Sequence, residues 1–242
     1  MSLQALDAAH EHPVQGAPVT QSRVRAGVRH PVGPVEEHPV FALLNPETRT
    51  KLIASGQSRV VEIGSSLSIN GCVTFVLDGL LGTVSRTSEV CVNLAGSGSV
   101  LGLEAGFDAP GAGRIVALAE SRVYSAPAAV LIEGLGRSRV LELCLHQALG
   151  RLHAMEVEAA CNAAHLVPQR LAKWLARLHR ANQERDIHLT QADLARLLGV
   201  QRTSVNAAAQ RLQSDGAARF TRGRIVIRDL EALSCSACDC LI

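Results

Sequence analysis

Residues 189 to 230 carry the pattern that most constrains the fold of this chain: two short amphipathic helices joined by one tight turn. The first helix begins after Thr190, an N-cap residue whose capping-box partner is Asp193. Gly199 ends it, because glycine adopts the left-handed conformation without strain. Helices joined so closely cross at a steep angle, so the sequence predicts a helix-turn-helix. The inward positions are Leu194, Leu197 and Leu198 in the first helix and Val205, Ala208, Ala209 and Leu212 in the second.

The second helix presents a polar face on which no acidic residue lies. A helix of this kind fits the major groove of DNA, where an arginine can bind guanine bidentately and an asparagine or glutamine can bind adenine. We therefore expect duplex DNA as the partner, with Thr190 and Gln191 adding contacts from the start of the first helix. The outward residues of the second helix are Arg202, Thr203, Ser204, Asn206 and Gln210.

A hairpin is predicted after the second helix, with strands at residues 218–220 and 225–227. Arg222 and Arg224 flank a glycine at its tip, which suits contact with phosphates. Together the helices and the hairpin read as a winged helix-turn-helix. A protein-docking or ligand-binding module whose winged helix does not bind DNA is the alternative, and the basic tip favours DNA.

The charge of the chain is unevenly distributed. The formal net charge is only +2, yet residues 165–229 hold twelve Lys/Arg and five Asp/Glu. The remainder is therefore acidic. A basic C-terminal part on an acidic body is typical of a protein that binds a polyanion.

The rest of the chain divides by composition. Residues 8 to 40 are rich in Pro, Gly and His without an apolar period, which predicts a mobile arm. Short apolar stretches from residue 59 to about 127, separated by Gly, Ser and Asn, predict an antiparallel β-barrel or jelly roll. The expected fold class is therefore α+β. The predicted arm, barrel sensor, dimerisation helix, winged helix-turn-helix and cysteine-containing tail are residues 1–40, 41–130, 131–166, 167–234 and 235–242.

Within residues 131–166, small and apolar residues recur at alternating steps of four and three. That spacing is the heptad seam of a helix that faces another helix. The seam could instead pack on the barrel, and we favour a homodimer. The predicted dimer residues are Leu141, Leu145, Ala148, Leu152, Met155 and Ala159.

No apolar run approaches the roughly 20 residues that span a bilayer, and the first residues lack the order of a secretion signal. We therefore expect a cytoplasmic protein without membrane contact. Seven cysteines, an odd number, fit reduced thiols in that compartment. The sequence also lacks a nucleophile elbow, a phosphate loop and paired carboxylates, so an enzyme is not expected.

The chain resembles the CRP/FNR superfamily of transcription regulators in the order of its parts, which are a barrel, a long helix, a Trp-bearing helix and a winged helix. The resemblance covers about residues 166 to 231, and the stretches that carry it are PQRLAKWL, LTQADLARLLGVQRTSV and RGRIVIRDLEAL, the last of which ends at Leu233. It implies a homodimer on a palindromic operator, an effector in the barrel, and RNA polymerase as a partner. Arg202 stands where the family places its guanine-reading arginine. Thr203 and Ala207 replace a glutamate and an arginine of well-known members, so the usual half-site does not transfer.

The resemblance also directs attention to a phosphate cassette in residues 96–120. Family members that bind cyclic nucleotides have a Gly-Glu pair and a later Arg-Ser/Thr pair. Here Glu104 comes one residue late, which would turn it to the other face of a strand, and Arg114 is followed by Ile115. We therefore do not expect cyclic AMP as the effector. Glu104 and Arg114 remain the residues to test for nucleotide binding.

Cysteines near the C-terminus offer a second sensing chemistry. Cys235, Cys238 and Cys240 could hold a soft metal or form a thiol switch, with Asp239 as an oxygen ligand. An inert reduced tail is the alternative, since termini are usually frayed. No cofactor is required by the sequence. The other cysteines are expected to be small buried residues and the arm histidines to be solvated: Cys72, Cys91, Cys144, Cys161, His10, His12, His30 and His38.

Overall fold

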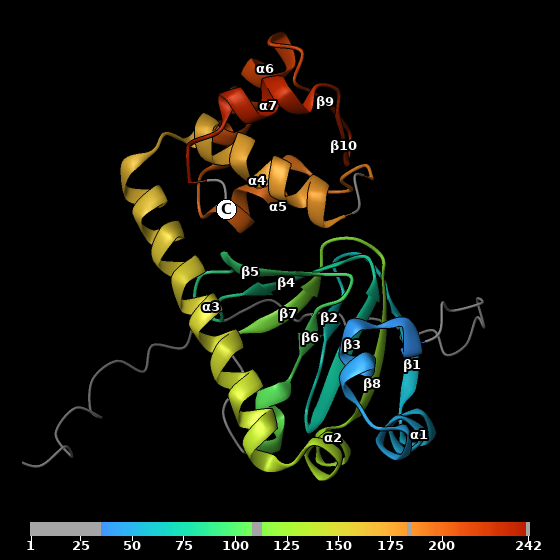
Figure 1. The fold of residues 1–242 in the computed structure, drawn as a ribbon. Helices are drawn as coiled ribbons and strands as arrows, with labels where there is room; N and C mark the ends of the chain where they lie inside the picture. The colour runs from blue at the N-terminus through green and yellow to red at the C-terminus, as the bar shows by residue number, and fades with distance from the viewer. Residues whose placement is uncertain (1–34, 108–112, 183–184, 241–242) are drawn as a thin grey trace, which may run out of the picture.

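Two four-stranded antiparallel sheets form the central domain of the computed structural model, which describes residues 35–107, 113–182 and 185–240 (Figure 1). The first sheet has the order β1-β8-β3-β6 and the second has the order β2-β7-β4-β5. The predicted antiparallel barrel is therefore confirmed. The strands are β1 (Gln57–Val61), β2 (Ser66–Leu67), β3 (Cys72–Asp78), β4 (Leu80–Val84), β5 (Cys91–Gly96), β6 (Val100–Leu101), β7 (Arg114–Ala117) and β8 (Ser121–Pro127).

Short helices close one end of the barrel. Two 3-10 helices, η1 (Val35–Glu37) and η2 (Pro39–Leu43), precede α1 (Pro46–Ser55), and a third, η3 (Leu103–Phe107), follows β6. The apolar core at this end includes Phe41 and Phe75, whose rings meet edge to face at 5.3 Å between centroids.

The predicted mobile arm was wrong for its last residues, 35–40, which fold onto the barrel. Val35 and His38 are both 5% exposed. The His38 side chain caps η2 by accepting from Val40 N, and Pro39 occupies a first-turn position where its missing N–H costs nothing. His38 is therefore a buried residue, not a solvated one. Residues 1–34, with His10, His12 and His30, lie outside the described residues.

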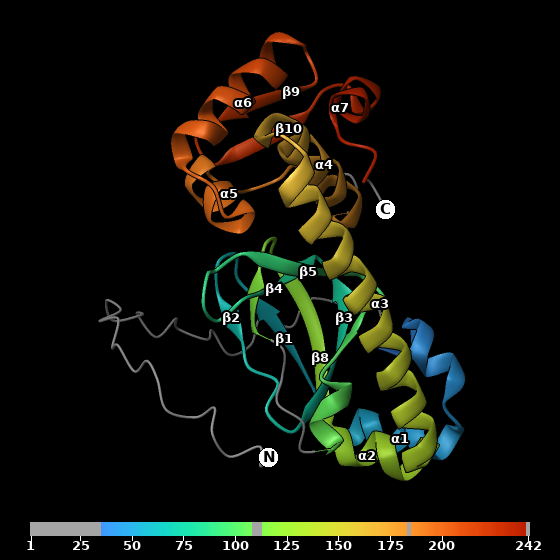
Figure 2. The same ribbon diagram turned by 90° about the vertical axis from the view of Figure 1, so that its left-hand side faces the viewer.

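The helical region after the barrel contains a break that the sequence analysis did not predict. Gly136, with φ of +82°, ends α2 (Ala128–Leu135) and precedes α3 (Arg137–Ala164). The long helix therefore begins at residue 137, later than the predicted 131. It runs along the barrel and continues up to the C-terminal domain (Figures 1 and 2).

The described part of the C-terminal domain contains four helices and a two-stranded hairpin. Its core joins Trp174 and Leu175 to Leu194, Val205 and Leu212, all buried as their helical spacing predicts. Helix α5 lies nearer the barrel, and α6 lies farther from it (Figure 2). The elements are α4 (Val167–Ala181), α5 (Gln191–Leu198), α6 (Arg202–Ser214), β9 (Ala218–Thr221), β10 (Arg224–Ile227) and α7 (Leu230–Ser236).

The two domains touch directly. Arg185 pairs with Asp78 of β3 at 3.1 Å, and a Cβ added at Gly199 would lie 2.9 Å from Val90 Cγ2. Among the described residues, no helix combines the length and hydrophobicity needed to cross a membrane.

Candidate nucleic-acid interface and barrel cavity

Local hydrogen bonds build the start of the helix-turn-helix. Asp193 N donates to Thr190 Oγ1 at 3.1 Å, and Thr190 N donates to Asp193 Oδ2 at 2.8 Å, so the predicted capping box is present. Burial of Asp193 acts to raise its pKa, but hydrogen bonds from Thr190 and Arg196 outweigh burial and lower the pKa. Gly199 ends α5 at φ of +65° and ψ of +39°, the left-handed conformation that its position predicts.

Helix α6 separates a buried face from an exposed one. Val205, Ala208, Ala209 and Leu212 are at most 2% exposed, which fixes the orientation of the whole helix. The polar face then points away from the domain core. Of the five residues predicted to contact bases, Ser204 is half-buried and the others are exposed: Arg202, Thr203, Asn206 and Gln210.

The two candidates at the start of α5 are placed differently. Thr190 is exposed, but its hydroxyl donates to Asp193 Oδ2 at 2.7 Å and accepts from Asp193 N, so its side chain is committed to the cap. Gln191 is half-buried at the first position of α5. Its backbone N–H belongs to the helix N-terminus, where unsatisfied donors favour phosphate groups.

The hairpin between β9 and β10 has the predicted wing geometry, with Gly223 at φ of +74° in the turn. Arg222 is exposed at its tip. Arg224 is the first residue of β10, and its Nε donates to Asp186 Oδ2 at 2.7 Å while its Nη2 pairs with the same oxygen. Of the two arginines predicted to contact phosphate, Arg224 is therefore already paired with a carboxylate, whereas Arg222 is exposed at the tip.

Arg219 on β9 and Arg211 on α6 are further exposed arginines near this surface that the sequence analysis did not select. Strand alternation was the signal for Arg219, because its neighbour Ala218 is buried. Together these residues extend the basic character of the hairpin and the end of α6.

An apolar stripe of exposed residues runs along α3, the long helix that follows one side of the barrel in Figure 1. Leu145 and Leu152 are 60% and 63% exposed, which is unusual for leucines placed at heptad spacing. Leu149 belongs to the same surface although the sequence analysis did not select it. The α3 stripe, all exposed in the single chain, consists of Leu141, Leu145, Ala148, Leu149, Leu152, Met155 and Ala159.

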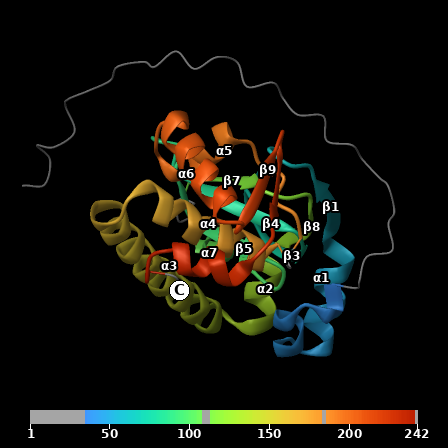
Figure 3. The same cartoon turned by 90° about the horizontal axis from the view of Figure 1, so that it is seen from above.

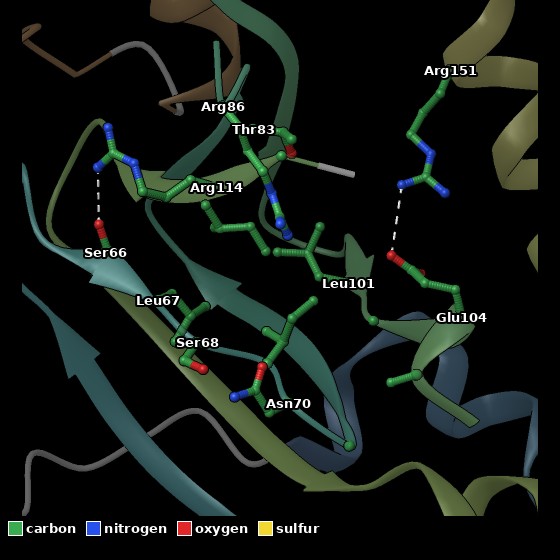
Figure 4. Close-up of a pocket in the computed structure, with 16 residues that line it drawn as sticks. Ser66, Leu67, Ser68, Asn70, Thr83, Arg86, Leu101, Glu104, Arg114 and Arg151 are labelled. Carbon is green, nitrogen blue, oxygen red and sulfur yellow. Dashed lines mark hydrogen bonds and ion pairs between the residues drawn. The ribbon is translucent and has the colours of Figure 1, made fainter. Parts of the chain in front are cut away.

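A cavity of about 690 Å³ opens in the barrel and is lined by both predicted effector residues (Figure 4). Glu104 lies on η3, not on a strand, so strand alternation does not set the direction of its side chain, which lines the cavity. Its Oε1 lies 4.0 Å from Arg151 Nη1, which extends from α3. Arg114 turns the other way, to Ser66 Oγ at 3.0 Å and Glu89 Oε1 at 3.0 Å.

The cysteines do not all follow their predictions. Cys91 and Cys161 are buried as expected, whereas Cys72 and Cys144 are half-buried. Burial raises the pKa of Cys91 to about 12, so this thiol stays protonated and inert. Cys235 is exposed on α7.

The tail was predicted as frayed in one interpretation, and the structure contradicts that for its described part. Cys238 is only 5% exposed and its sulfur lies 3.5 Å from Cys161 Sγ. Asp239 is exposed and is not among the grouped ligand atoms.

Residues 169–235 match the model of the Crp-like helix-turn-helix domain. No curated protein matches the chain. Several solved structures share the fold of about three quarters or more of the chain. A CRP/FNR-family protein from Eubacterium rectale superposes with a TM-score of 0.64 at 17% identity, over 81% of this chain and 96% of that one.

Two further structures are similar at this level. FixK2 from Bradyrhizobium japonicum gives a TM-score of 0.59 at 18% identity, over 76% of this chain and 98% of that one. The c-di-GMP-responsive global regulator CLP from Xanthomonas campestris gives 0.58 at 18% identity, over 76% and 99%. At these identities the likeness establishes a common fold.

Proposed function

We propose that this chain, a CRP/FNR-type regulator with a Crp-like helix-turn-helix domain at residues 169–235, acts as a homodimer that binds a palindromic operator in duplex DNA. The observation that carries the proposal is the exposed face of α6. Arg202, Asn206 and Gln210 stand exposed on a helix whose opposite face is buried in the domain core. These side chains have the donors and acceptors that read base edges in the major groove.

The α3 stripe supports the homodimer. A contiguous row of exposed leucines on a helix is a typical mark of an interface, because leaving it in water forfeits its burial energy. Pairing α3 with α3 of a second copy would place two α6 helices on one face of the dimer. Two recognition helices about one helical turn of DNA apart match a palindromic operator.

Selection of bound sites from random duplexes tests the proposal. A regulator enriches one palindromic sequence and binds it about 10³-fold or more tightly than random duplex at the same salt concentration, and its binding to both weakens as the salt concentration rises. A winged helix that serves only for protein docking, the alternative function, enriches no sequence and shows no salt-dependent duplex binding.

We further infer a small anionic effector other than cyclic AMP for the barrel cavity. Arg86, Arg114 and Arg151 line it against one carboxylate, Glu104. The Gly-Glu and Arg-Ser/Thr pairs of cyclic-nucleotide sites are absent from the lining, where Gly102 precedes Leu103 and Arg114 precedes Ile115. Thermal stability measured with cyclic AMP, c-di-GMP and inorganic pyrophosphate separates the classes, since a ligand of the folded state raises the unfolding temperature.

A regulator of this type works where the DNA and RNA polymerase are, so the cytoplasm is the proposed location and RNA polymerase a proposed partner. We assign no catalytic role to the chain. In this proposal the chain acts only by binding: an effector in the barrel, a second copy along α3, and DNA through the winged helix-turn-helix.

A further inference from the structure

A cluster of three cysteines and one histidine lies where the end of α3 meets the C-terminal tail. Cys161 and His165 come from the end of α3, and Cys238 and Cys240 follow α7. One sulfur or nitrogen atom from each of the four lies within 4.8 Å of every other. In the view from above, α7 and the upper part of α3 lie beside one another (Figure 3). We call these four residues the Cys/His cluster.

We propose that the Cys/His cluster binds a single thiophilic divalent cation of the zinc class, with three sulfur ligands and one imidazole ligand. Cys₃His is one of the common tetrahedral donor sets for structural zinc. The inference concerns this part of the chain alone and does not depend on the proposed DNA binding.

The distances fit one ion. With Zn–S bonds of about 2.3 Å and Zn–N bonds of about 2.0 Å, tetrahedral ligands stand about 3.5–3.8 Å apart. Cys161 Sγ lies 3.5 Å from Cys238 Sγ, and Cys240 Sγ lies 3.6 Å from His165 Nδ1. An iron–sulfur cluster would need its ligands farther apart, because several iron and sulfide atoms stand between them.

Local structure explains how a short tail completes the site. Cys161 and His165 are four residues apart, the spacing that puts two side chains on one face of a helix. His165 is the C-cap residue of α3, and its N–H donates to the Cys161 carbonyl at 3.0 Å. A two-cysteine tail could not close a four-ligand site alone, and the end of α3 supplies the missing pair.

A buried cation beside the cluster is the second, independent observation. Lys173 is fully buried and donates from Nζ to Cys161 Sγ at 3.1 Å. Its other partner is Glu158 Oε2 at 2.8 Å, and Arg177 shares the same carboxylate. Two cations on one carboxylate leave an uncompensated positive charge at the cluster, which is costly when buried.

The proposed metal site balances that charge. A divalent ion with three thiolates and a neutral imidazole carries one net negative charge. Lys173, Glu158 and Arg177 together carry one net positive charge. The arrangement resembles the outer-shell hydrogen bonding that usually supports metal-bound ligands. Three protonated thiols would leave Lys173 facing a neutral sulfur with no such compensation.

The site also has an entry path. Cys161 and Cys238 are buried, but His165 and Cys240 are half-buried and form its outer side. An ion can therefore enter from solvent and complete its coordination with the tail. Only Leu166 and His165 separate α3 from α4, so a bound ion would fasten the tail to this junction.

The test uses the full-length chain, purified with reductant and stripped of metal by a chelator. Titration with Co²⁺ should give one equivalent per chain and the intense visible bands of tetrahedral cobalt–thiolate coordination, and Zn²⁺ should displace the colour. We expect His165→Gln and Cys240→Ser, at the outer side of the site, to lower metal affinity by more than the roughly 10- to 100-fold that loss of an outer-shell partner costs.

Cys235→Ser is the matched control, because Cys235 is an exposed thiol on the preceding helix outside the cluster. It should leave affinity and spectrum unchanged. The proposal is overturned by octahedral cobalt spectra, by wild-type metal affinity in the His165→Gln and Cys240→Ser variants, by iron–sulfur absorption in the purified protein, or by the absence of stoichiometric metal binding to the reduced chain.

Discussion

Arg224 holds Asp186 through two guanidinium nitrogens, Nε at 2.7 Å and Nη2, so the start of β10, next to the turn of the wing, is tied to the segment before α5. This pairing divides the two wing arginines. Arg222 lies two residues earlier, at the exposed tip of the hairpin, and forms no ion pair with a carboxylate among the described residues. Arg224 must give up part of an existing contact before it can bind a phosphate.

The wing is therefore predicted to bind phosphate chiefly through Arg222. Arg222→Ala should weaken binding to specific and random duplexes alike and lower the slope of log K against log salt by about 1, the value of one lost phosphate contact. Arg224→Ala should change that slope less. Fluorescence anisotropy at several salt concentrations measures both. Equal slopes for wild type and Arg222→Ala would contradict the assignment.

Arg202 is predicted to read a base. Arg202→Ala should cost about 1–3 kcal/mol on the selected operator and relax the preference at one position in each half-site. The physical reason is the loss of a bidentate contact to a base edge, which random duplex does not offer. Arg211→Ala, at the other end of α6, is the matched control and should leave base preference intact. Site selection with each variant gives the answer, and a uniform loss on all sequences would count against base reading by Arg202.

The α3 stripe is predicted to hold the dimer together. Leu152→Glu should raise the dimer dissociation constant at least about 100-fold, because an unpaired carboxylate buried at an interface costs several kcal/mol. His153→Glu places the same charge on the next residue of α3, off the stripe, and should leave the dimer intact. Light scattering over a dilution series compares the two. If both variants remain dimeric, the interface lies elsewhere.

Local signals explain what the sequence predicted well. The capping box of Thr190 and Asp193 and the left-handed Gly199 lie within a few residues of the helix that they delimit. The same holds for the buried stripe of α6. Each signal acts over one or two helical turns, so reading the chain in order is sufficient.

The missed features join residues that are far apart in the chain. His38 donates toward Ser99, Arg224 pairs with Asp186, and Cys161 meets Cys238, each across a separation that only the folded chain closes. The sequence predicted a solvated residue at His38, a phosphate contact at Arg224, a buried thiol at Cys161 and a short tail at Cys238, and in no case the partner. Tertiary packing determines these contacts, because burial against a specific partner compensates the conformational entropy that is lost when a segment of low apolar content becomes ordered.

The barrel cavity is predicted to respond to the charge of its lining. Arg114→Gln should abolish or weaken the thermal stabilisation by whichever phosphate-bearing probe the wild type binds, because a neutral amide cannot balance a phosphate. Glu104→Gln should strengthen it, since removing a carboxylate makes the cavity more positive. Arg139→Gln, an exposed substitution at the start of α3, is the control. Stabilisation that is unchanged in Arg114→Gln would show that Arg114 does not balance the charge of the ligand.

His38 is predicted to make the barrel end sensitive to acid. Burial lowers the pKa of His38, and the hydrogen bond with the Ser99 carbonyl opposes burial without cancelling it. Val40 N donates to Nδ1, so Nε2 carries the proton that faces Ser99, and the buried ring is neutral. The unfolded chain binds a proton near pH 6.5, whereas the folded chain binds it only at lower pH. The contribution of His38 to stability is therefore complete above about pH 6.5 and is lost as the pH falls below it.

Urea unfolding between pH 5 and pH 8 measures this dependence. In wild type the free energy of unfolding should fall below pH 6.5 by at most about 1.4 kcal/mol per pH unit for one proton. His38→Gln can keep both hydrogen bonds without titrating, so its profile should be flatter, although it loses the ring contact with Phe75 and should be less stable at pH 8. His146→Gln, an exposed histidine on α3, should retain the wild-type slope. A wild-type slope in His38→Gln would assign the acid sensitivity to other groups.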